Sequence, residues 1–339
     1  MNQNINWGII GLGNIALRFA EAFQDTKNSK LKAISSKNPD KMKIFQKKYN
    51  INEKYCFNEY EQLLKCEDID VVYIALPNSM HTEWIKKSIN SKKNILVEKP
   101  AFINLQDAEA IQIKLIDSNL FFAEGFMYRY TPLINKVIEI IKKKTIGKPT
   151  SMTSNFGVNL LTKKNIFGFN KKKKIDKNNR LYSKELGGGS ILDLGCYPVS
   201  FSCLIASIIS EIDYDKIKIL DKKKEISSTG VDINSSLNIK FDNEFISQIK
   251  TSFSKNLGTE TIINGSHGVL RIANPWLAEP PNIILEGKIN KEIKIKFNNN
   301  IYSYEIDAVS KNILEKKIKP DFPGVSISET IGSTKILSQ

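Results

Sequence analysis

The sequence has few of the features that mark a secreted, disulfide-bonded or membrane-spanning protein. Its four cysteines, Cys56, Cys66, Cys196 and Cys203, form no CxxC pair, and so small a number favours a reducing cytoplasm. The longest mainly apolar stretch, residues 199–210, holds about a dozen residues, too few to span a bilayer. The first residues lack the basic segment of a secretory signal. We therefore expect a cytoplasmic protein with no membrane partner.

Histidine and arginine are also scarce. His81 and His267 are the only histidines, and no cluster of His, Cys and carboxylate residues has ligand spacing, so we expect no metal. Only four of the 50 basic residues are arginines, although the formal net charge is +14. Phosphate and base recognition favours arginine, so we expect no nucleic-acid partner. The local cluster from Lys171 to Lys174 is still able to attract an anionic ligand.

The remaining composition is that of a folded globular chain. Its 339 residues are 41% hydrophobic and 25% charged, and they suffice for two domains of ordinary size. We place the boundary between residues 124 and 125, which gives domains of 1–124 and 125–339.

The first residues predict a dinucleotide-binding unit. Residues 5–10, INWGII, form an apolar strand that leads directly into GLGNIA, and residues 30–36 supply a second strand after a helix of apolar periodicity. In this βαβ unit Gly11 permits a tight turn, Gly13 lets the backbone approach a pyrophosphate, and Ala16 is the third small residue. The phosphate is expected at the start of the helix.

The end of the second strand predicts the choice of cofactor. NAD-binding proteins usually place an acidic residue here for the ribose 2′-hydroxyl, whereas this chain has Ser36 and Lys37. A hydroxyl and an ammonium are suited to a 2′-phosphate, so we predict NADP, with NAD possible. The alternative is that Lys37 simply begins a solvated loop.

Two further strands end in polar loops. Residues 71–77, VVYIALP, and 94–100, NILVEKP, are typical of buried parallel strands. Ligands of such sheets bind beyond the carboxyl ends of the strands, so the residues that follow them are expected to share one crevice. His81 is also compatible with a structural role. These residues are Pro77, Asn78, His81, Glu98 and Lys99.

The second half of the chain combines a helix with strands. Three glycines, residues 187–189, precede a segment in which Asp193 and Tyr197 stand four residues apart, a spacing that puts both side chains on one helical face. The glycines are expected to let the backbone approach a substrate. Alternating patterns over 236–254, 259–272 and 282–297 predict consecutive strands.

Five motifs together resemble one family. The segments GIIGLGNIA, LPNSMHTEW, VEKP, EGFMYRYTP and ELGGGSILDLGCYP, in this order between residue 5 and about residue 205, resemble the Gfo/Idh/MocA oxidoreductases. The resemblance implies an α/β protein: an N-terminal Rossmann domain with a doubly wound parallel sheet, then an α/β domain with a large, mostly antiparallel sheet. That second sheet commonly forms a dimer, so a homodimer or homotetramer is expected.

The resemblance also implies the catalytic set. Lys99 of the EKP motif is expected beside the nicotinamide, and Asp193 and Tyr197 complete the site, with tyrosine where inositol-type relatives have histidine. Tyr197 is the expected proton-transfer group, because a neighbouring ammonium brings the ordinary pKa of a phenol, about 10, towards neutrality. Asp193 orients the substrate or Lys99. The opposite assignment, with Lys99 as proton donor, stays open.

The remaining expected contacts fall into two sets. The resemblance implies that residues 126–132, which follow a strand, line the nicotinamide side, although core packing of the aromatic residues of this segment is an equal alternative. The expected substrate contacts are Lys99, Arg129, Arg180, Asp193 and Tyr197. The expected cofactor contacts are Gly11, Gly13, Asn14, Ile15, Ser36, Lys37, Leu76, Pro77, Asn78, His81, Glu98, Lys99 and Met127.

These expectations define an oxidoreductase that transfers a hydride between NADP(H) and a hydroxyl or carbonyl carbon of a sugar-like polyol, an aldose or a trans-dihydrodiol. Two alternatives stay open. One is a 3-ketoreductase of nucleotide-linked sugars, in which the 171–174 lysines and Arg180 hold a diphosphate. The other is a regulatory protein of this fold that binds the dinucleotide without turning it over.

Overall fold

The computed structural model describes residues 4–164, 170–173, 175–276 and 282–339. The chain forms two compact units. The first comprises Met1–Thr131 and Phe297–Thr334, and the second comprises Pro132–Lys296 and Lys335–Gln339. The structure thus differs from a single boundary after residue 124, because a C-terminal segment returns to the first unit.

Six parallel strands form the sheet of the first unit, in the order β3-β2-β1-β4-β5-β6. This is the strand order of dinucleotide-binding sheets, and the order reverses between β1 and β4, where such sheets bind ligands. It confirms the predicted doubly wound sheet. The strands are β1 (Ile5–Ile10), β2 (Ser29–Ser35), β3 (Cys56–Phe57), β4 (Val71–Ile74), β5 (Asn94–Glu98) and β6 (Phe122–Gly125).

Helices cover both faces of this sheet, since its strands carry apolar side chains on both sides. On one face Ile10, Val72 and Val97 join a cluster with α3, α4 and α5. On the other face Phe19 of α1 stacks on Tyr73 at 3.7 Å between ring centroids. The helices in chain order are α1 (Asn14–Glu21), α2 (Pro39–Lys48), α3 (Tyr60–Lys65), α4 (Asn78–Asn90) and α5 (Leu105–Ile116).

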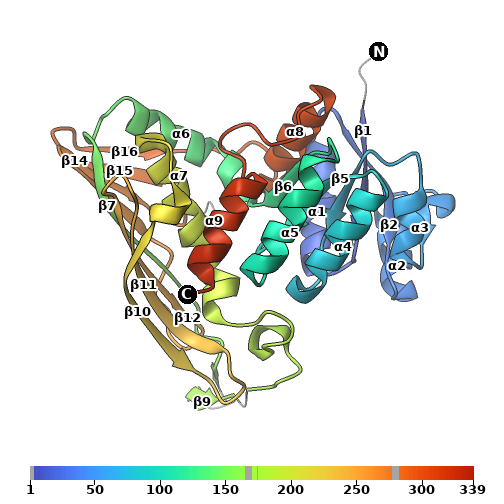
Figure 1. Ribbon diagram of the computed structural model, residues 1–339, viewed down its shortest axis with the longest axis horizontal. Helices are drawn as coiled ribbons and strands as arrows, with labels where there is room; N and C mark the ends of the chain where they lie inside the picture. Colours follow the sequence, from blue (N-terminus) through green and yellow to red (C-terminus); the bar gives the residue numbers. More distant parts are fainter. Residues whose placement is uncertain (1–3, 165–169, 174, 277–281) are drawn as a thin grey trace. The chain divides into compact units, whose positions relative to one another are not determined.

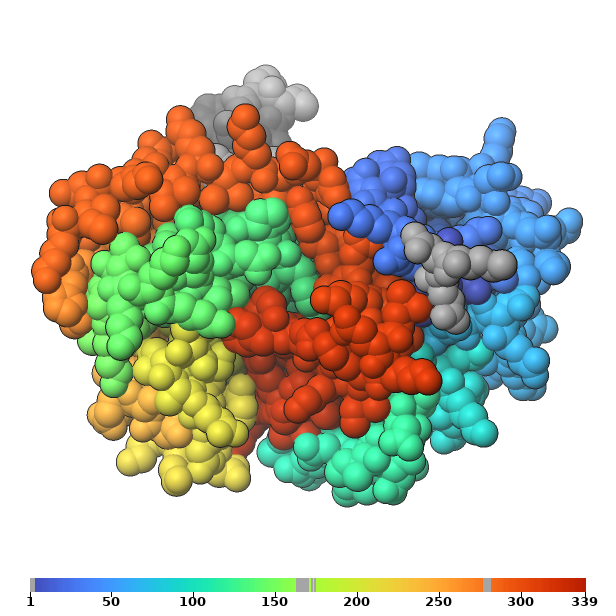
Figure 2. Space-filling view, turned by 90° about the horizontal axis from the view of Figure 1, so that it is seen from above, coloured from blue at the N-terminus to red at the C-terminus, as the bar shows by residue number. Residues whose placement is uncertain are grey.

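Helix α8 (Ile301–Leu314) explains why the C-terminal segment belongs to the first unit. The Trp7 indole N–H donates to the Ser310 hydroxyl at 2.9 Å, and the Lys27 amide donates to Asp307 at 3.0 Å. In Figure 2 this red segment lies against the blue and teal residues of the same unit. The chain then continues into α9 (Ile327–Leu337). Tertiary contacts of this kind have no local sequence signal.

Eight strands form the sheet of the second unit, in the order β10-β11-β12-β7-β13-β14-β15-β16. All neighbours are antiparallel except β12 and β7, as predicted for a mostly antiparallel sheet. A small pair, β8 (Thr162–Lys164) and β9 (Asn170–Lys172), lies outside it. The main strands are β7 (Pro149–Gly157), β10 (Lys218–Ile226), β11 (Asp232–Lys240), β12 (Ile246–Ser252), β13 (Thr261–Gly265), β14 (Gly268–Ile272), β15 (Asn282–Gly287) and β16 (Lys291–Lys294).

Among the described residues, helices pack on one face of this sheet (Figure 1). Helix α7 (Cys196–Ile209) packs on β7 and β12, and α6 (Pro132–Lys142) packs on α7. The segment Ile191–Ile209 is long and apolar enough to cross a membrane by length and composition, but 72% of its most apolar window is buried inside the protein. This burial accounts for its composition as a core helix.

Candidate active site

The glycine turn after β1 has the shape of a phosphate cradle. Gly11 has a φ of +91°, and a Cβ there would lie 2.7 Å from the carbonyl oxygen of Ala75. At Gly13, by contrast, no described atom lies within 4 Å of the position a Cβ would take, so the backbone is open. Asn14 and Ile15 begin α1 directly after it, and no side chain caps this end within the described part of the chain. The free amides at the helix start suit a pyrophosphate.

At the end of β2, Ser36 and Lys37 differ in exposure. Ser36 is 5% exposed and its hydroxyl accepts a hydrogen bond from the Asn38 amide at 3.1 Å. Lys37 is exposed, and its ammonium lies 5.8 Å from the centroid of the Tyr60 ring. Two polar groups and no carboxylate therefore follow the strand at the position where ribose selectivity is read.

The loops after β4 and β5 are joined by His81. Its side chain is fully buried, and its ring nitrogens lie 2.9 Å from the Leu76 carbonyl oxygen and 3.0 Å from that of Pro100. Burial lowers the pKa of this imidazole. His81 is thus a structural link between the two loops, a correction to the cofactor contact predicted for it. Pro77 and Asn78, at the start of α4, stay half-buried.

Glu98 and Lys99 form a corner at the end of β5. Glu98 is 9% exposed; its Oε1 accepts a hydrogen bond from the Tyr73 hydroxyl, and its Oε2 accepts one from the Lys99 amide at 3.2 Å. The Glu98 carboxylate is therefore turned inward. Lys99 is half-buried, so it is the residue of the EKP motif whose side chain is partly accessible.

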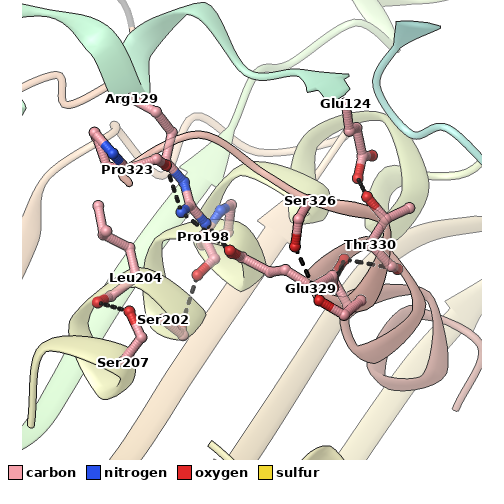
Figure 3. A network of polar contacts seen from close by, with 12 residues as sticks. Glu124, Arg129, Pro198, Ser202, Leu204, Ser207, Pro323, Ser326, Glu329 and Thr330 are labelled. Atoms are coloured by element: carbon pink, nitrogen blue, oxygen red, sulfur yellow. Dashed lines mark hydrogen bonds and ion pairs between the residues drawn. The ribbon is translucent and has the colours of Figure 1, made fainter. Parts of the chain in front are cut away.

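The 126–132 segment is part of the core, the alternative left open by the sequence. Met127 is 7% exposed and Arg129 is 1% exposed. The Arg129 guanidinium forms an ion pair with Glu329 of α9 and donates to the Pro323 carbonyl at 3.1 Å, as Figure 3 shows. The substrate contact predicted for Arg129 is corrected by this geometry, because its guanidinium is buried and paired within the first unit.

In the second unit, Asp193 and Tyr197 lie where a π-helical turn, Ile191–Gly195, joins α7. Hydrogen bonding from i to i+5 in such a turn keeps residues four apart on one face, and π turns are frequent at functional sites. The Arg180 guanidinium forms an ion pair with Asp193, with 3.0 Å between its nitrogen and Oδ1 of the carboxylate. The half-buried Tyr197 ring contacts Phe156 and Trp276, with centroids 5.6 and 6.0 Å away.

Two of the three glycines before this turn make room for the chain itself. A Cβ on Gly188 would lie 2.7 Å from the carbonyl oxygens of Arg180 and Leu181, and one on Gly189 would lie 2.3 Å from Oδ1 of Asp232. Gly189 also has a φ of +117°. The expectation that the glycines make room for a substrate is therefore corrected for Gly188 and Gly189: they make room for neighbouring backbone and a buried carboxylate.

Sequence reasoning missed Asp232, the residue that holds this turn. Asp232 is 7% exposed, and its Oδ2 accepts hydrogen bonds from the Ser190 hydroxyl at 2.6 Å, the Ile191 amide at 2.9 Å and the Ser235 hydroxyl at 2.6 Å. It fixes the start of the helical segment that carries Asp193 and Tyr197. Its only signal in the sequence is an acidic residue at the start of an alternating strand.

The predicted catalytic residues fall in different units, with Lys99 in the first and Asp193 and Tyr197 in the second. Their association stays a prediction. Of the lysine cluster, Lys171 and Lys173 are exposed, whereas Lys174 lies outside the described residues. Within the described ranges no group of three or more His, Cys, Asp or Glu side chains is arranged to hold a metal ion.

A Rossmann unit with an open glycine turn and a second unit built on an antiparallel sheet define a two-domain dinucleotide-dependent protein. Comparison with known proteins gives the family. Residues 5–126 match the oxidoreductase family with an NAD-binding Rossmann fold, GFO/IDH/MocA, and residues 134–271 match the GFO/IDH/MocA C-terminal domain. The chain belongs to this family and is an NAD(P)-binding oxidoreductase.

Several relatives extend over most of the chain. It is 27% identical to a trans-1,2-dihydrobenzene-1,2-diol dehydrogenase of Xenopus tropicalis, over 96% of this chain and 94% of that protein. It is 26% identical to a D-xylose 1-dehydrogenase (NADP(+)) of Haloferax volcanii, over 73% and 69%. A 3-ketoreductase from Actinomadura kijaniata, solved with NADP and TDP-benzene, superposes with a TM-score of 0.82 at 20% identity, over 99% and 96%.

Proposed function

We propose that this protein transfers a hydride between NADP(H) and a hydroxyl or carbonyl carbon of a sugar-like polyol, an aldose or a trans-dihydrodiol. The observation that carries the proposal is the π-helical turn that puts Asp193 and Tyr197 on one face, in a chain whose other unit has an open glycine cradle. The names of the relatives, a dihydrodiol dehydrogenase and a xylose dehydrogenase, support the substrate class.

The chain's residues fit an NADP molecule. Gly13 and the start of α1 leave backbone amides open for the pyrophosphate, and Ser36 with Lys37 offers a hydroxyl and an ammonium for the 2′-phosphate. A carboxylate at this position would repel that phosphate, whereas each charge-assisted hydrogen bond to it contributes about 1.5–3 kcal/mol. Bound nicotinamide supplies the hydride acceptor or donor.

Proton transfer is assigned to this chain's own side chains. Tyr197 takes the proton from the substrate hydroxyl during oxidation and returns it during reduction. Lys99 provides the ammonium that favours the ionised phenol and binds the reacting oxygen. Asp193 orients the substrate, and its ion pair with Arg180 fixes the direction of its carboxylate.

The test is steady-state kinetics with free polyols, aldoses and dihydrodiols. We expect Tyr197→Phe and Lys99→Ala each to lower kcat by roughly two to four powers of ten without loss of folding, and kcat/KM to be higher with NADP than with NAD. The matched controls are Tyr304→Phe and Lys41→Ala, a half-buried tyrosine and an exposed lysine of the first unit. Near-normal turnover in either catalytic variant would contradict the assignment.

A 3-ketoreductase of nucleotide-linked sugars is the second candidate, because a protein of that activity shares the fold. It requires a cation for the diphosphate, yet Arg180 is already paired with Asp193. We therefore expect faster turnover of free than of nucleotide-bound sugars.

We also propose that the protein forms a homodimer through the sheet face that no described helix covers, and that it is located in the cytoplasm. The mass of the protein in solution, measured by light scattering, checks the dimer.

A further inference from the structure

The first unit holds a second buried carboxyl group besides Glu98, close enough for Glu98 to act on it as a like charge. Glu305, in the middle of α8, is 1% exposed, and its Oε1 has no hydrogen-bond partner among the described residues. The Phe126 amide donates to the same carboxyl group. A buried carboxylate with an unpaired oxygen is costly, whereas protonation removes the charge and turns that oxygen into a donor.

The groups around Glu305 come from several elements of the first unit. Glu98 at the end of β5 acts on it as a like charge. Burial raises the pKa of the phenols of Tyr73, on β4, and Tyr130, on the 3₁₀ turn after β6, and Glu305 raises both further. Tyr302 lies nearly one helical turn earlier on α8 than Glu305. Like Glu305, it raises the pKa of Tyr73, in addition to the effect of burial. None of these neighbours is a cation that would balance a second negative charge.

Only one of the two carboxyl groups has donors for an anion on both oxygens. Glu98 accepts hydrogen bonds from the Tyr73 hydroxyl and from the Lys99 amide. Two carboxyl groups that interact in a buried, low-dielectric place do not both ionise at neutral pH. The negative charge is therefore stabilised on Glu98 and the proton on Glu305.

We infer that Glu305 is a positioning residue that remains a neutral carboxylic acid, keeps Glu98 as the single anion of the pair, and through Glu98 holds Lys99 in place. The part that concerns catalysis rests on the proposed function, since it takes Lys99 as catalytic. The part that concerns the proton does not, and the two parts are tested separately.

The proton is tested by folding measurements without substrate. Glu305→Gln keeps the shape of the neutral acid but cannot ionise. Because the folded wild type holds a proton that the unfolded chain loses above about pH 4.5, its folding equilibrium constant should fall relative to the variant by up to about tenfold per pH unit. Urea unfolding at pH 5, 6 and 7 measures this, with the exposed Glu109→Gln as control. Parallel curves for wild type and Glu305→Gln would overturn the inference.

The positioning role is tested by kinetics of the folded enzyme. Glu305→Gln should keep kcat within about twofold at pH 7, whereas Glu305→Ala should lower kcat by about tenfold or more while the dissociation constant for NADP changes little. A purely structural role would lower the melting temperature and leave kcat unchanged. A Gln variant as impaired as the Ala variant would show that the ionised form is needed. Full activity of Lys99→Ala would instead refute the proposed function and leave the folding test valid.

Discussion

Asp232 gives the sharpest prediction about stability, because one buried oxygen accepts three hydrogen bonds. Asp232→Ala removes the partner of the Ser190 hydroxyl, the Ile191 amide and the Ser235 hydroxyl at once. A hydrogen bond to a charged acceptor contributes about 1.5–3 kcal/mol. The three share one oxygen and are not additive, so we expect a loss of about 3–5 kcal/mol, the range found when buried polar networks are broken.

The isosteric variant separates charge from geometry. Asp232→Asn keeps an acceptor oxygen but loses the negative charge, so we expect it to lose about 1–2 kcal/mol of the free energy of unfolding. The assay is urea unfolding followed by fluorescence, in which Trp276 reports on the second unit because it is buried there and contacts Tyr197. The control is Asp221→Ala, an exposed aspartate on β10 of the same sheet, with an expected change below about 0.5 kcal/mol.

The same variants also test how the candidate site is built. Ser190 precedes and Ile191 begins the turn that carries Asp193, so loss of their anchor should lower kcat even under conditions where the protein stays folded. A destabilisation below about 1 kcal/mol for Asp232→Ala would refute the reasoning, since three buried donors would then have found other partners at no cost.

Two further predictions concern the buried network of the first unit (Figure 3). Arg129→Met should lower the free energy of unfolding by about 3–5 kcal/mol, because it leaves the Glu329 carboxylate, which is only 17% exposed, without its cation. The double variant Arg129→Met/Glu329→Gln should recover much of this loss. Urea unfolding measures both, and an equally unstable double variant would contradict the ion-pair explanation. Glu124 is buried, and burial raises its pKa to about 7. The folded state thus binds this proton more tightly than the unfolded chain does. Stability relative to Glu124→Gln should therefore be highest below about pH 4.5, fall by about 3 kcal/mol up to pH 7 and stay level above it, as unfolding curves at pH 4.5 to 8 would show; a difference independent of pH would contradict the assignment.

Local patterns predicted most of the fold. The apolar run before GLGNIA, the run within VVYIALP and the run that ends in VEKP form strands of one parallel sheet. The alternating pattern over residues 236–254 forms β11 and β12. These signals are local, since a strand buried on both faces needs a continuous apolar run and a strand covered on one face needs alternation. The return of α8 to the first sheet is set by contacts such as that of Trp7 with Ser310, which are 303 residues apart.

The candidate site was predicted less evenly, for a physical reason. Residue types at motif spacing predicted the tight turn at Gly11, the open backbone at Gly13 and the helical turn at Asp193, because these features follow from the local backbone. The roles of these residues in binding and catalysis stay predictions. The motif spacing did not predict the partners of charged side chains. Arg129 and His81 are chemically suited to bind ligands, yet both are buried, and their partners, Glu329 for Arg129 and the Pro100 carbonyl for His81, lie elsewhere in the chain. Exposure of a polar side chain is decided by tertiary packing, which a single sequence does not display.

Pro198 explains why the segment DLGCYP forms a π turn and an α-helix in succession. In a regular α-helix the amide of residue 198 would donate to the Leu194 carbonyl, but proline has no N–H and its ring crowds that carbonyl. The helix must therefore open just before Pro198, and the π-helical turn ends at Gly195, three residues earlier. A Cβ on Gly195 would lie 2.6 Å from Cδ1 of Ile191, so the end of that side chain would have to move to admit it. Proline and glycine thus shape this turn: Asp193 lies within it, and Tyr197 follows in the first turn of α7.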